Sequence, residues 1–421
     1  MCGVAGIVRA AGLDAEAARA SVERMLAFIR HRGPDEAGTY ADARAVLGAV
    51  RLKILDLVGG QQPMLDASTR TVLAYNGETY SFRELGRELA SRGHRLSTRS
   101  DTEVVLNALV EWGEGALARL DGPFALAWYD ARDGSVLLAR DRFGERPLYY
   151  AEHDGALVFA SEMKAFLALP GFALSFDAAA LATLFLLWTP LPDGTPFAGI
   201  RQVPPGCALR VRGDEREIVR FADVDVERPA FLGSSEDAAA RARELLTESV
   251  RLRMRSDVEV GTYLSGGLDS AIVTSLARLH GSGRLHTFSV EFEEPAFDES
   301  HDQRALRGFF GTEHEAVRVG PGDVARAFPQ AMWHAEVPAF RTAFVPMFLL
   351  ARAARAAGVV VVLSGEGADE TFLGYDVFKE TLVRAAWSER RDVGALRRLY
   401  PYLPHFRDEN AAALAAVFDR F

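Results

Sequence analysis

Short strand-like segments follow one another closely through the first half of the chain, and this spacing restricts the fold more than any other feature. Gly, Asp and Pro turn signals separate the segments GVAGIV, AVLGAVRL, TVLAYNGE, FALAWYD, SVLLARD, PLYYAE and ALVFASE. Strands with this spacing favour a largely antiparallel sheet arrangement. Helical patterns over residues 14–30, 81–92 and 101–112 interrupt it. The first half is therefore predicted to be built on antiparallel strands.

A different pattern begins beyond a Pro- and Gly-rich stretch at 188–206, which is predicted to be an irregular connection. A helical pattern covers 236–253, and VGTYLSGGLDSAIVTSLARLH then indicates a strand, a glycine turn and a helix. LHTFSVEF and VVVVLSGEGADE add further apolar strands. Buried strands that alternate with helices predict a parallel α/β sheet. We therefore predict two domains, residues 1–210 and 235–421.

Composition limits the class of partner. The chain has 421 residues, of which 49% are hydrophobic, so it can bury more than one core. Its formal net charge of −10 opposes broad contact with nucleic acid or an anionic membrane, and its apolar runs are too short to cross a bilayer. Cys2 and Cys207 lack the spacing of a disulfide framework or zinc site. Small polar substrates and a cytoplasmic location are expected.

The turn SGGLDS, residues 265–270, has the composition of a phosphate-binding loop between a strand and a helix. Gly266 and Gly267 permit a tight turn whose N–H groups can face a phosphate, and Ser265 and Ser270 add hydroxyl donors. Asp269 would repel a phosphate unless a cation lay between them, which suggests Mg²⁺. The turn therefore predicts a nucleotide site.

A second glycine-acid cluster, SGEGADE at 364–370, also follows an apolar strand. If both strands are parallel in one sheet, Asp269 and Asp369 can converge across its carboxyl edge. A plain polar turn after a buried strand is the alternative for either cluster, and a lone glycine pair would favour it. Two such clusters in one domain favour the nucleotide site, although neither a lysine-containing phosphate loop nor GxGxxG is present.

These motifs carry a family resemblance over nearly the whole chain. SGGLDS and LSGEGADETFLGY resemble the pyrophosphate-loop synthetase domain of glutamine-dependent asparagine synthetases. The first half resembles their class II glutaminase domain in MCGVAGI, RHRGPDE, RLKILD, QQP, YNGETY, SDTEV, DGPFALAWYD, RDRFGERPLYY and ASEMKA. The resemblance implies an α+β and α/β two-domain protein. An αββα Ntn-hydrolase sandwich would be followed by a parallel ATP-pyrophosphatase-like domain.

By this resemblance Cys2 is the glutaminase nucleophile. Removal of Met1 would place a thiol and an α-amine on one residue, so that nucleophile and base lie together. Attack on the glutamine amide would release ammonia and leave a glutamyl thioester for water. Cys207, in GCALRV, keeps the role of a buried structural cysteine.

The resemblance also implies the residues that bind glutamine. Arg51 would pair with its α-carboxylate, and Asp101, aided by Glu78, with its α-ammonium group. Asn76 and the Gly77 N–H would hold the developing oxyanion. The RHRGPDE stretch around Arg32 and Asp35 is expected at the edge of this site, without a chemical step.

In the second domain the resemblance implies a site for ATP and Mg²⁺. Asp269 and Asp369 would hold the metal, and Glu366 would handle the proton when ammonia attacks an acyl-adenylate. Ammonia would have to cross between the domains through a channel. The ATP-binding residues implied are Leu264, Ser265, Gly266, Gly267, Asp269, Ser270, Val290, Ser364 and Gly365.

The sequence defines the carboxylate that would accept ammonia less well than the other substrates. Aspartate is the first expectation, but EVPAFRTAFVPMF has Pro338 where the family pattern would have a hydroxyl residue. The family's later Arg-Val-Pro-Phe-Leu-Asp-like segment and lysine do not occur before Phe421, so a C-terminally shortened synthetase domain is expected. The alternatives are another carboxylate acceptor, from secondary metabolism or the cell wall, a glutaminase that no longer ligates, and a non-enzymatic scaffold. The resemblance also implies a homodimer.

Six of the nine histidines are weighed as metal ligands; they show no metal-ligand spacing and are interpreted as surface or packing residues. They are His31, His94, His286, His301, His314 and His334.

Overall fold

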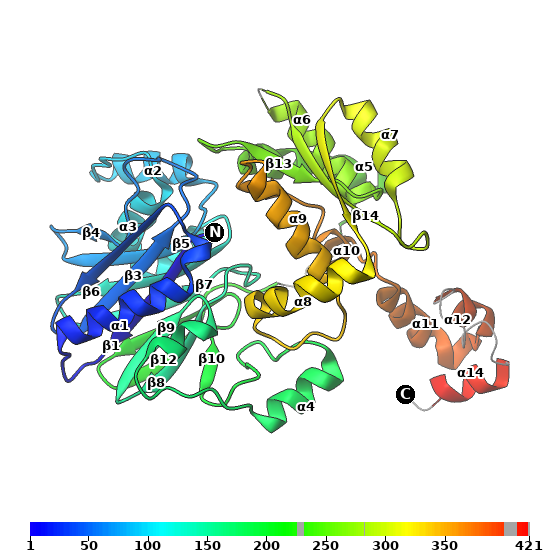
Figure 1. Ribbon diagram of the computed structural model, residues 1–421. Helices are drawn as coiled ribbons and strands as arrows, with labels where there is room; N and C mark the ends of the chain where they lie inside the picture. The colour runs from blue at the N-terminus through cyan, green and yellow to red at the C-terminus, as the bar shows by residue number, and fades with distance from the viewer. Residues whose placement is uncertain (225–230, 282, 400–410, 420–421) are drawn as a thin grey trace.

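A computed structural model describes residues 1–224, 231–281, 283–399 and 411–419 of the chain (Figure 1). Residues 225–230 of the predicted interdomain stretch, and 282, 400–410 and 420–421 of the predicted second domain, lie outside the described residues.

The strands are β1 (Gly3–Val8), β2 (Glu36–Ala41), β3 (Ala45–Arg51), β4 (Met64–Asp66), β5 (Thr71–Gly77), β6 (Phe124–Asp130), β7 (Ser135–Arg140), β8 (Tyr149–His153), β9 (Ala156–Ala160), β10 (Ile200–Gln202), β11 (Cys207–Arg212), β12 (Glu215–Arg220), β13 (Val260–Tyr263), β14 (His286–Phe292), β15 (Glu313–Val319) and β16 (Val361–Leu363).

The α-helices are α1 (Ala15–Phe28), α2 (Phe82–Ser91), α3 (Asp101–Trp112), α4 (Ala178–Leu187), α5 (Ser235–Arg253), α6 (Leu268–His280), α7 (Ser300–Phe310), α8 (Pro321–Ala335), α9 (Phe344–Ala356), α10 (Ala368–Phe372), α11 (Asp376–Arg390), α12 (Val393–Leu399) and α14 (Ala411–Phe418). Short 3₁₀ helices are η1 (Arg30–Arg32), η2 (Gly113–Arg119) and η3 (Met163–Ala168).

Two antiparallel sheets face each other in the first half of the chain. Their strand orders are β10-β8-β9-β1-β3-β2 and β12-β11-β7-β6-β5-β4. Val4 and Leu47 of the first sheet share one buried cluster with Val72, Ala127 and Leu138 of the second. Alternating apolar residues on the inner faces therefore form a core between the sheets.

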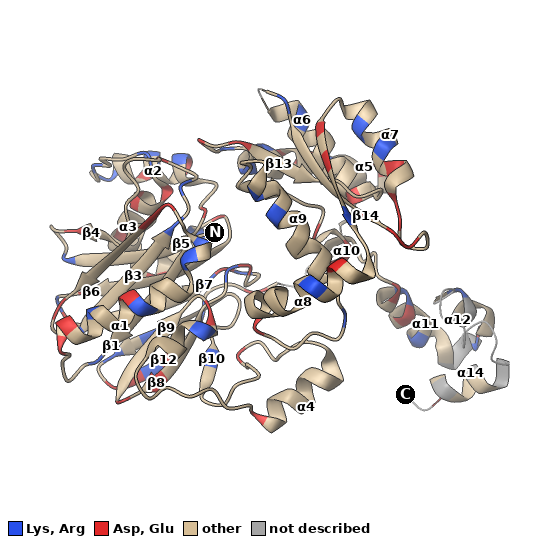
Figure 2. Cartoon of the chain, in the orientation of Figure 1, with Lys and Arg blue, Asp and Glu red and all other residues tan. Residues whose placement is uncertain are grey.

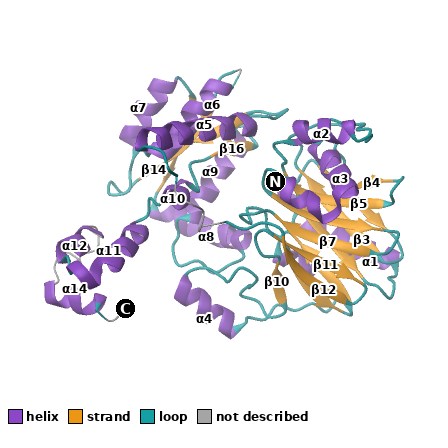
Figure 3. Cartoon of the chain, turned by 180° about the vertical axis from the view of Figure 1, so that it is seen from behind, coloured by secondary structure: helices purple, strands orange, loops and turns teal. Residues whose placement is uncertain are grey.

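Helices cover the outer face of each sheet. Val22 and Met25 of α1 pack with Ile7 of the first sheet, and Leu85 of α2 packs with Leu73 of the second, where α3 also lies. Figure 3 shows the strands of this half with α2 and α3 beside them. The predicted αββα sandwich is confirmed.

The second half contains one parallel sheet, with strand order β15-β14-β13-β16. Phe288 of β14 packs against Leu350 of α9, while Val250 of α5 packs near Ala277 of α6. β13 and β16 are neighbours, with Thr262 opposite Leu363. The turns that follow these two strands therefore meet at one sheet edge, and the predicted parallel α/β domain is confirmed.

The predicted strands and helices are present, but the prediction omits six strands of the described residues: β2, β4, β10 and β12 at the edges of the antiparallel sheets, β11 beside β12, and β15 at one edge of the parallel sheet. Edge strands bury less surface than central ones, so their sequences carry a weaker apolar pattern. The irregular connection expected over 188–206 is corrected at Ile200–Gln202, which forms β10. The charge-dense residues Glu215–Arg220 form the exposed edge strand β12.

The two domains contact each other directly. Arg255 forms a two-point ion pair with Glu84 of α2, at 2.8 and 2.9 Å, and the Asp56 N–H donates to Asp257 at 2.8 Å. Basic and acidic residues are interspersed over both domains (Figure 2). Among the described residues, no helix is both long and apolar enough to cross a membrane.

Candidate functional site

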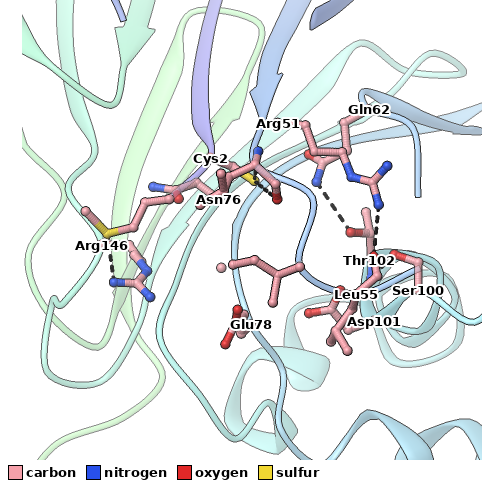
Figure 4. A pocket seen from close by; sticks show the side chains of 14 residues that line it. Cys2, Arg51, Leu55, Gln62, Asn76, Glu78, Ser100, Asp101, Thr102 and Arg146 are labelled. Atoms are coloured by element: carbon pink, nitrogen blue, oxygen red, sulfur yellow. Dashed lines mark hydrogen bonds between the residues drawn. The ribbon is translucent and has the colours of Figure 1, made fainter. Parts of the chain in front are cut away.

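Cys2 lies at a cavity that other predicted site residues also line, the first cavity. Gly3 pairs with Val50, so this register places Cys2 beside the end of β3, where its Sγ accepts a hydrogen bond from the Leu52 N–H at 3.4 Å. The cavity has a volume of about 40 Å³. Burial raises the pKa of the Cys2 thiol, and the nearby N-terminal ammonium group opposes this. The predicted residues that line the cavity are Cys2, Arg51, Asn76, Gly77, Glu78 and Asp101 (Figure 4).

Asn76 brings an unpartnered amide to this cavity. It lies at the end of β5 and is 1% exposed, yet neither its Nδ2 nor its Oδ1 has a hydrogen-bond partner among the described residues. A buried amide without partners is costly, so it is suited to pair with a ligand. A side chain on Gly77 would lie 2.6 Å from the Pro123 carbonyl oxygen, so the tight approach needs glycine.

Two neighbouring carboxyl groups form the acidic side of the cavity. Burial raises the pKa of Asp101 to about 6, although the Thr79 N–H donates to it at 3.0 Å. Burial and the charge of Asp101 raise the pKa of Glu78 to about 7. Each rise shows that the ionised form lacks sufficient compensation, so a bound cation would stabilise both charges.

Arg51 is held rigidly at the same cavity. It is 4% exposed, and its guanidinium group donates to the Glu36 carboxylate at 3.1 Å, the Leu55 carbonyl at 2.9 Å and the Asp56 carbonyl at 2.6 Å. Three acceptors therefore fix the orientation of this positive charge opposite the acidic pair.

The second cavity, of about 1220 Å³, opens at the carboxyl edge of the parallel sheet. Both glycine-acid turns contribute to it. A side chain on Gly365 would lie 2.9 Å from the Asp269 Cβ and from the Ser270 nitrogen, so glycine lets the turns touch. The structure thus brings Asp269 and Asp369 to one cavity. The predicted residues that line it are Leu264, Ser265, Gly267, Asp269, Ser270, Val290, Ser364, Gly365, Glu366 and Asp369.

Gly266 differs from its neighbours in the first turn, because it is not among the lining residues. Its N–H donates to the Glu299 carboxylate at 2.9 Å. In the rest of the turn, the Ser265 and Ser270 hydroxyls are 2.9 Å apart, and the Gly267 N–H donates to Ser265 at 3.1 Å. An acidic side chain therefore already accepts one of the N–H groups expected to face a phosphate.

Comparison with sequence families gives the two halves separate matches. The glutamine amidotransferase domain family matches residues 1–222, and the asparagine synthase family matches residues 241–419. The chain belongs to the glutamine-hydrolysing asparagine synthetase family. Two sequence families on one chain agree with the two folds and the two cavities.

Similar proteins come from bacteria and fungi. A putative asparagine synthetase [glutamine-hydrolyzing] of Mycobacterium tuberculosis is 37% identical over 408 residues, covering 91% of this chain and 61% of the relative. Asparagine synthetase [glutamine-hydrolyzing] 3 of Bacillus subtilis is 33% identical, and the match covers 90% of this chain and 64% of the relative. Amidase chyE of Penicillium rubens is 34% identical, and the match covers 86% of this chain and 56% of the relative. The chain thus spans about three fifths of the length of these curated relatives.

Sequence reasoning singled out only part of the first cavity of this asparagine synthetase family member. Gln62 accepts from the Tyr75 N–H at 2.8 Å and lies 3.4 Å from the Thr102 hydroxyl. Arg146 lies beside Met1, with its Nη1 3.0 Å from the Met1 sulfur. Gln62 and Arg146 belong to the motifs QQP and RDRFGERPLYY, which was the only signal that could have found them.

The second cavity contains a glutamine that no motif indicated. Gln303 of α7 is 3% exposed, and its Nε2 donates to the Val290 carbonyl at 3.0 Å. Its Oε1 is buried without a partner among the described residues. An isolated polar residue on an amphipathic helix carries no sequence signal, so only the fold reveals it.

The donors at this edge fit Mg²⁺ only if the ligand supplies oxygens too. Asp269 and Asp369 present carboxylates, and the Ser265 and Ser270 hydroxyls lie nearby. Within the described parts of the chain, no group of three or more His, Cys, Asp or Glu residues could hold a metal ion. Mg²⁺ commonly combines one or two carboxylates with substrate phosphates, and the residues present match that arrangement.

The acidic pair predicts a pH dependence for glutamine use. The family resemblance implies that Asp101 and Glu78 pair with the glutamine α-ammonium group. Below their pKa values of about 6 and about 7, both carboxyl groups are protonated and lack the charge that this pairing needs. We therefore expect kcat/KM for glutamine, which reports on the free enzyme, to rise as the pH passes through these values. A fixed-time assay of glutamate release, repeated across this pH range, measures kcat/KM. A Glu78→Gln variant should lose the upper step, and a flat wild-type profile would contradict the assignment.

Proposed function

We propose that the chain is a glutamine-dependent amide-forming ligase. In this proposal residues 1–210 hydrolyse glutamine, and residues 235–421 use ATP to activate a carboxylate. The observation that carries it is the pair of cavities: one contains Cys2 with the unpartnered Asn76 amide, and the other contains both glycine-acid turns.

Glutamine hydrolysis is assigned to Cys2. After removal of Met1, the α-amine of Cys2 would accept the thiol proton, and the thiolate would attack the side-chain amide carbon of glutamine. With Met1 in place, burial lowers the pKa of the Met1 amine to about 5, so the surroundings at the start of the chain disfavour a charged amine. The proton then passes to the leaving ammonia, and water hydrolyses the thioester to glutamate.

The other lining residues hold glutamine in place. Arg51 would bind its α-carboxylate, and Asp101 with Glu78 its α-ammonium group, through charge-assisted contacts. The Asn76 amide and the Gly77 N–H would stabilise the negative oxygen that forms on attack. Removing one such donor typically costs about 10²–10³-fold in kcat.

Carboxylate activation is assigned to the second cavity. The serine-glycine turn would bind the ATP phosphates, with Leu264, Val290 and Gly365 near the adenine. Asp269 and Asp369 would hold Mg²⁺, whose charge offsets that of the departing pyrophosphate. The acceptor carboxylate displaces pyrophosphate and becomes an acyl-adenylate. Ammonia from the first cavity then attacks the acyl carbon, Glu366 takes the surplus proton, and AMP leaves.

Aspartate is the proposed acceptor, by analogy with the named asparagine synthetases. A larger carboxylate is the second candidate. The cavity also has apolar lining, including Phe297, Val324 and Met347, and one relative is named an amidase. The proposal includes the homodimer that the family resemblance implies.

A direct test supplies the purified chain with glutamine, ATP and Mg²⁺ and a panel of carboxylates led by aspartate. Glutamate and pyrophosphate are measured together. Pyrophosphate that depends on aspartate supports asparagine synthesis, and pyrophosphate that depends on another acid supports the second candidate. Glutamate without pyrophosphate for any acceptor would reduce the chain to a glutaminase.

A further inference from the structure

Three motif segments that have no step in the proposed chemistry meet at the contact between the domains. RHRGPDE supplies Arg32, ASEMKA supplies Glu162 and Lys164, and EVPAFRTAFVPMF begins with Glu336. Each of these side chains is less than one tenth exposed. Four buried charges of alternating sign therefore form one series, which begins beside Cys2 and ends at the C-terminal end of α8.

The first part of this series reaches Cys2. The Arg32 Nε donates to the Cys2 carbonyl oxygen at 2.9 Å, and its Nη1 donates to Glu162 at 2.8 Å. His31 adds a bond to the same carboxylate at 2.9 Å. The backbone of the proposed nucleophile is thus held by an arginine whose own orientation depends on Glu162.

The second part crosses to the other domain. Lys164 forms an ion pair with Glu162, donates to the Trp333 carbonyl at 2.9 Å, and lies 3.5 Å from the Glu336 carboxylate. That carboxylate also accepts the N–H groups of Met163 at 2.8 Å and Lys164 at 2.7 Å. Glu336 therefore binds both the backbone and the side chain of the ASEMKA segment.

The backbone at Glu336 is unusual. It ends α8 in the left-handed region, at φ 61°, which non-glycine residues rarely adopt. Such conformations persist where surrounding contacts hold them and often occur at switch regions. The bonds to η3 are contacts of this kind.

The pKa of Glu162 reflects its close pairing with the positive groups around it. Burial opposes ionisation of Glu162, but the His31 bond and the Arg32 and Lys164 charges lower its pKa to about 2. Burial raises the pKa of Glu336. The His334 ring lies edge-on to His31, with centroids 4.5 Å apart. Buried ion networks are weak sources of stability but can specify one geometry.

Glu336 is also connected to the second cavity on both sides. Pro321 and Val324 of α8, which precede Glu336 in the sequence, line the second cavity. Arg341 and Pro346, which follow Glu336, line the same cavity. A ligand that shifts either segment would act on the residue between them. In Figure 1, α8 and α9 lie on the side of the second domain that faces the sandwich.

We propose that Arg32, Glu162, Lys164 and Glu336 form a relay that couples ATP–Mg²⁺ binding in the second cavity to the positioning of Cys2 in the first. Lys164 and Glu336 are positioning residues, since neither lines the first cavity. The inference rests on the proposed function. Couplings between sites typically change binding affinity by about 5–150-fold, and contiguous hydrogen-bond networks can carry them.

The test measures glutamine hydrolysis by the full chain with and without ATP–Mg²⁺, in wild type, Glu336→Gln, Lys164→Met and Glu84→Gln. We expect ATP–Mg²⁺ to raise wild-type kcat by about 5-fold or more. Both relay variants should lose this response with little change in KM for glutamine. Glu84→Gln breaks a different interdomain ion pair, with Arg255, and should keep the response.

The inference is overturned if wild type does not respond to ATP–Mg²⁺, if the relay variants respond normally, or if Glu84→Gln behaves as they do. Thermal unfolding of each variant identifies loss of folding, and Lys164→Arg, which retains the charge, should recover part of the response. Alkylation of Cys2 by iodoacetamide, with and without ATP–Mg²⁺, separates the two proposals. A chain that hydrolyses no glutamine refutes the proposed function, whereas a Cys2 reactivity that responds to ATP–Mg²⁺ only with an intact relay still supports the relay.

Discussion

Replacing Cys2 with alanine is expected to lower glutamine hydrolysis by more than about 10³-fold, because the variant has no group that can form the glutamyl thioester. Pyrophosphate formation with ammonium chloride as the nitrogen source should continue, since the second cavity does not contain Cys2. The measurement is the release of glutamate and of pyrophosphate, once with glutamine and once with ammonium chloride as the nitrogen source.

Cys207→Ala is the matched control for this variant. Cys207 is 2% exposed and lies in the core between the two sheets, so its replacement removes a small buried group and should cost about 1 kcal/mol of stability. Glutamine hydrolysis should remain. Retained hydrolysis in Cys2→Ala, or equal loss in both variants, would contradict the role of Cys2 as nucleophile.

The second large effect is expected from Asp369→Asn. This change removes one of the two carboxylates proposed to hold Mg²⁺, so ATP-dependent pyrophosphate formation should fall by about 100-fold or more. Raising the Mg²⁺ concentration should recover part of the rate. Glutamine hydrolysis without ATP should be unchanged, because Asp369 lines the second cavity and not the first. Coupled pyrophosphate assays over a Mg²⁺ titration measure this.

Asp376→Asn provides the comparison for that loss. Asp376 begins α11 and pairs with Lys379 at 2.8 Å, and it is not among the residues that line the second cavity. The variant should form pyrophosphate at the wild-type rate. If it fails as Asp369→Asn does, the effect belongs to folding of this region and the metal assignment is wrong.

Local sequence was sufficient for most strands and for part of the lining of each cavity. The central strands and α1 to α3 follow from period and turn signals, which depend on near neighbours. The residues predicted for glutamine do line one cavity, and those predicted for ATP line another, with Gly266 as the exception. Motifs identify such residues because the chemistry requires particular side chains at particular turns.

The sequence by itself therefore determined two domains, their fold classes and the side chains available for chemistry. Only the tertiary structure decided the pKa values of those side chains and the contacts between them. The raised pKa values of Glu78 and Asp101 arise from burial, which depends on the packing of α3 and β5 rather than on adjacent residues. Arg32 meets Glu162 across 130 positions, and Lys164 meets Glu336 across 172. Contacts at such separations leave no local pattern, because the chain brings them together only after both sheets and both domains have formed.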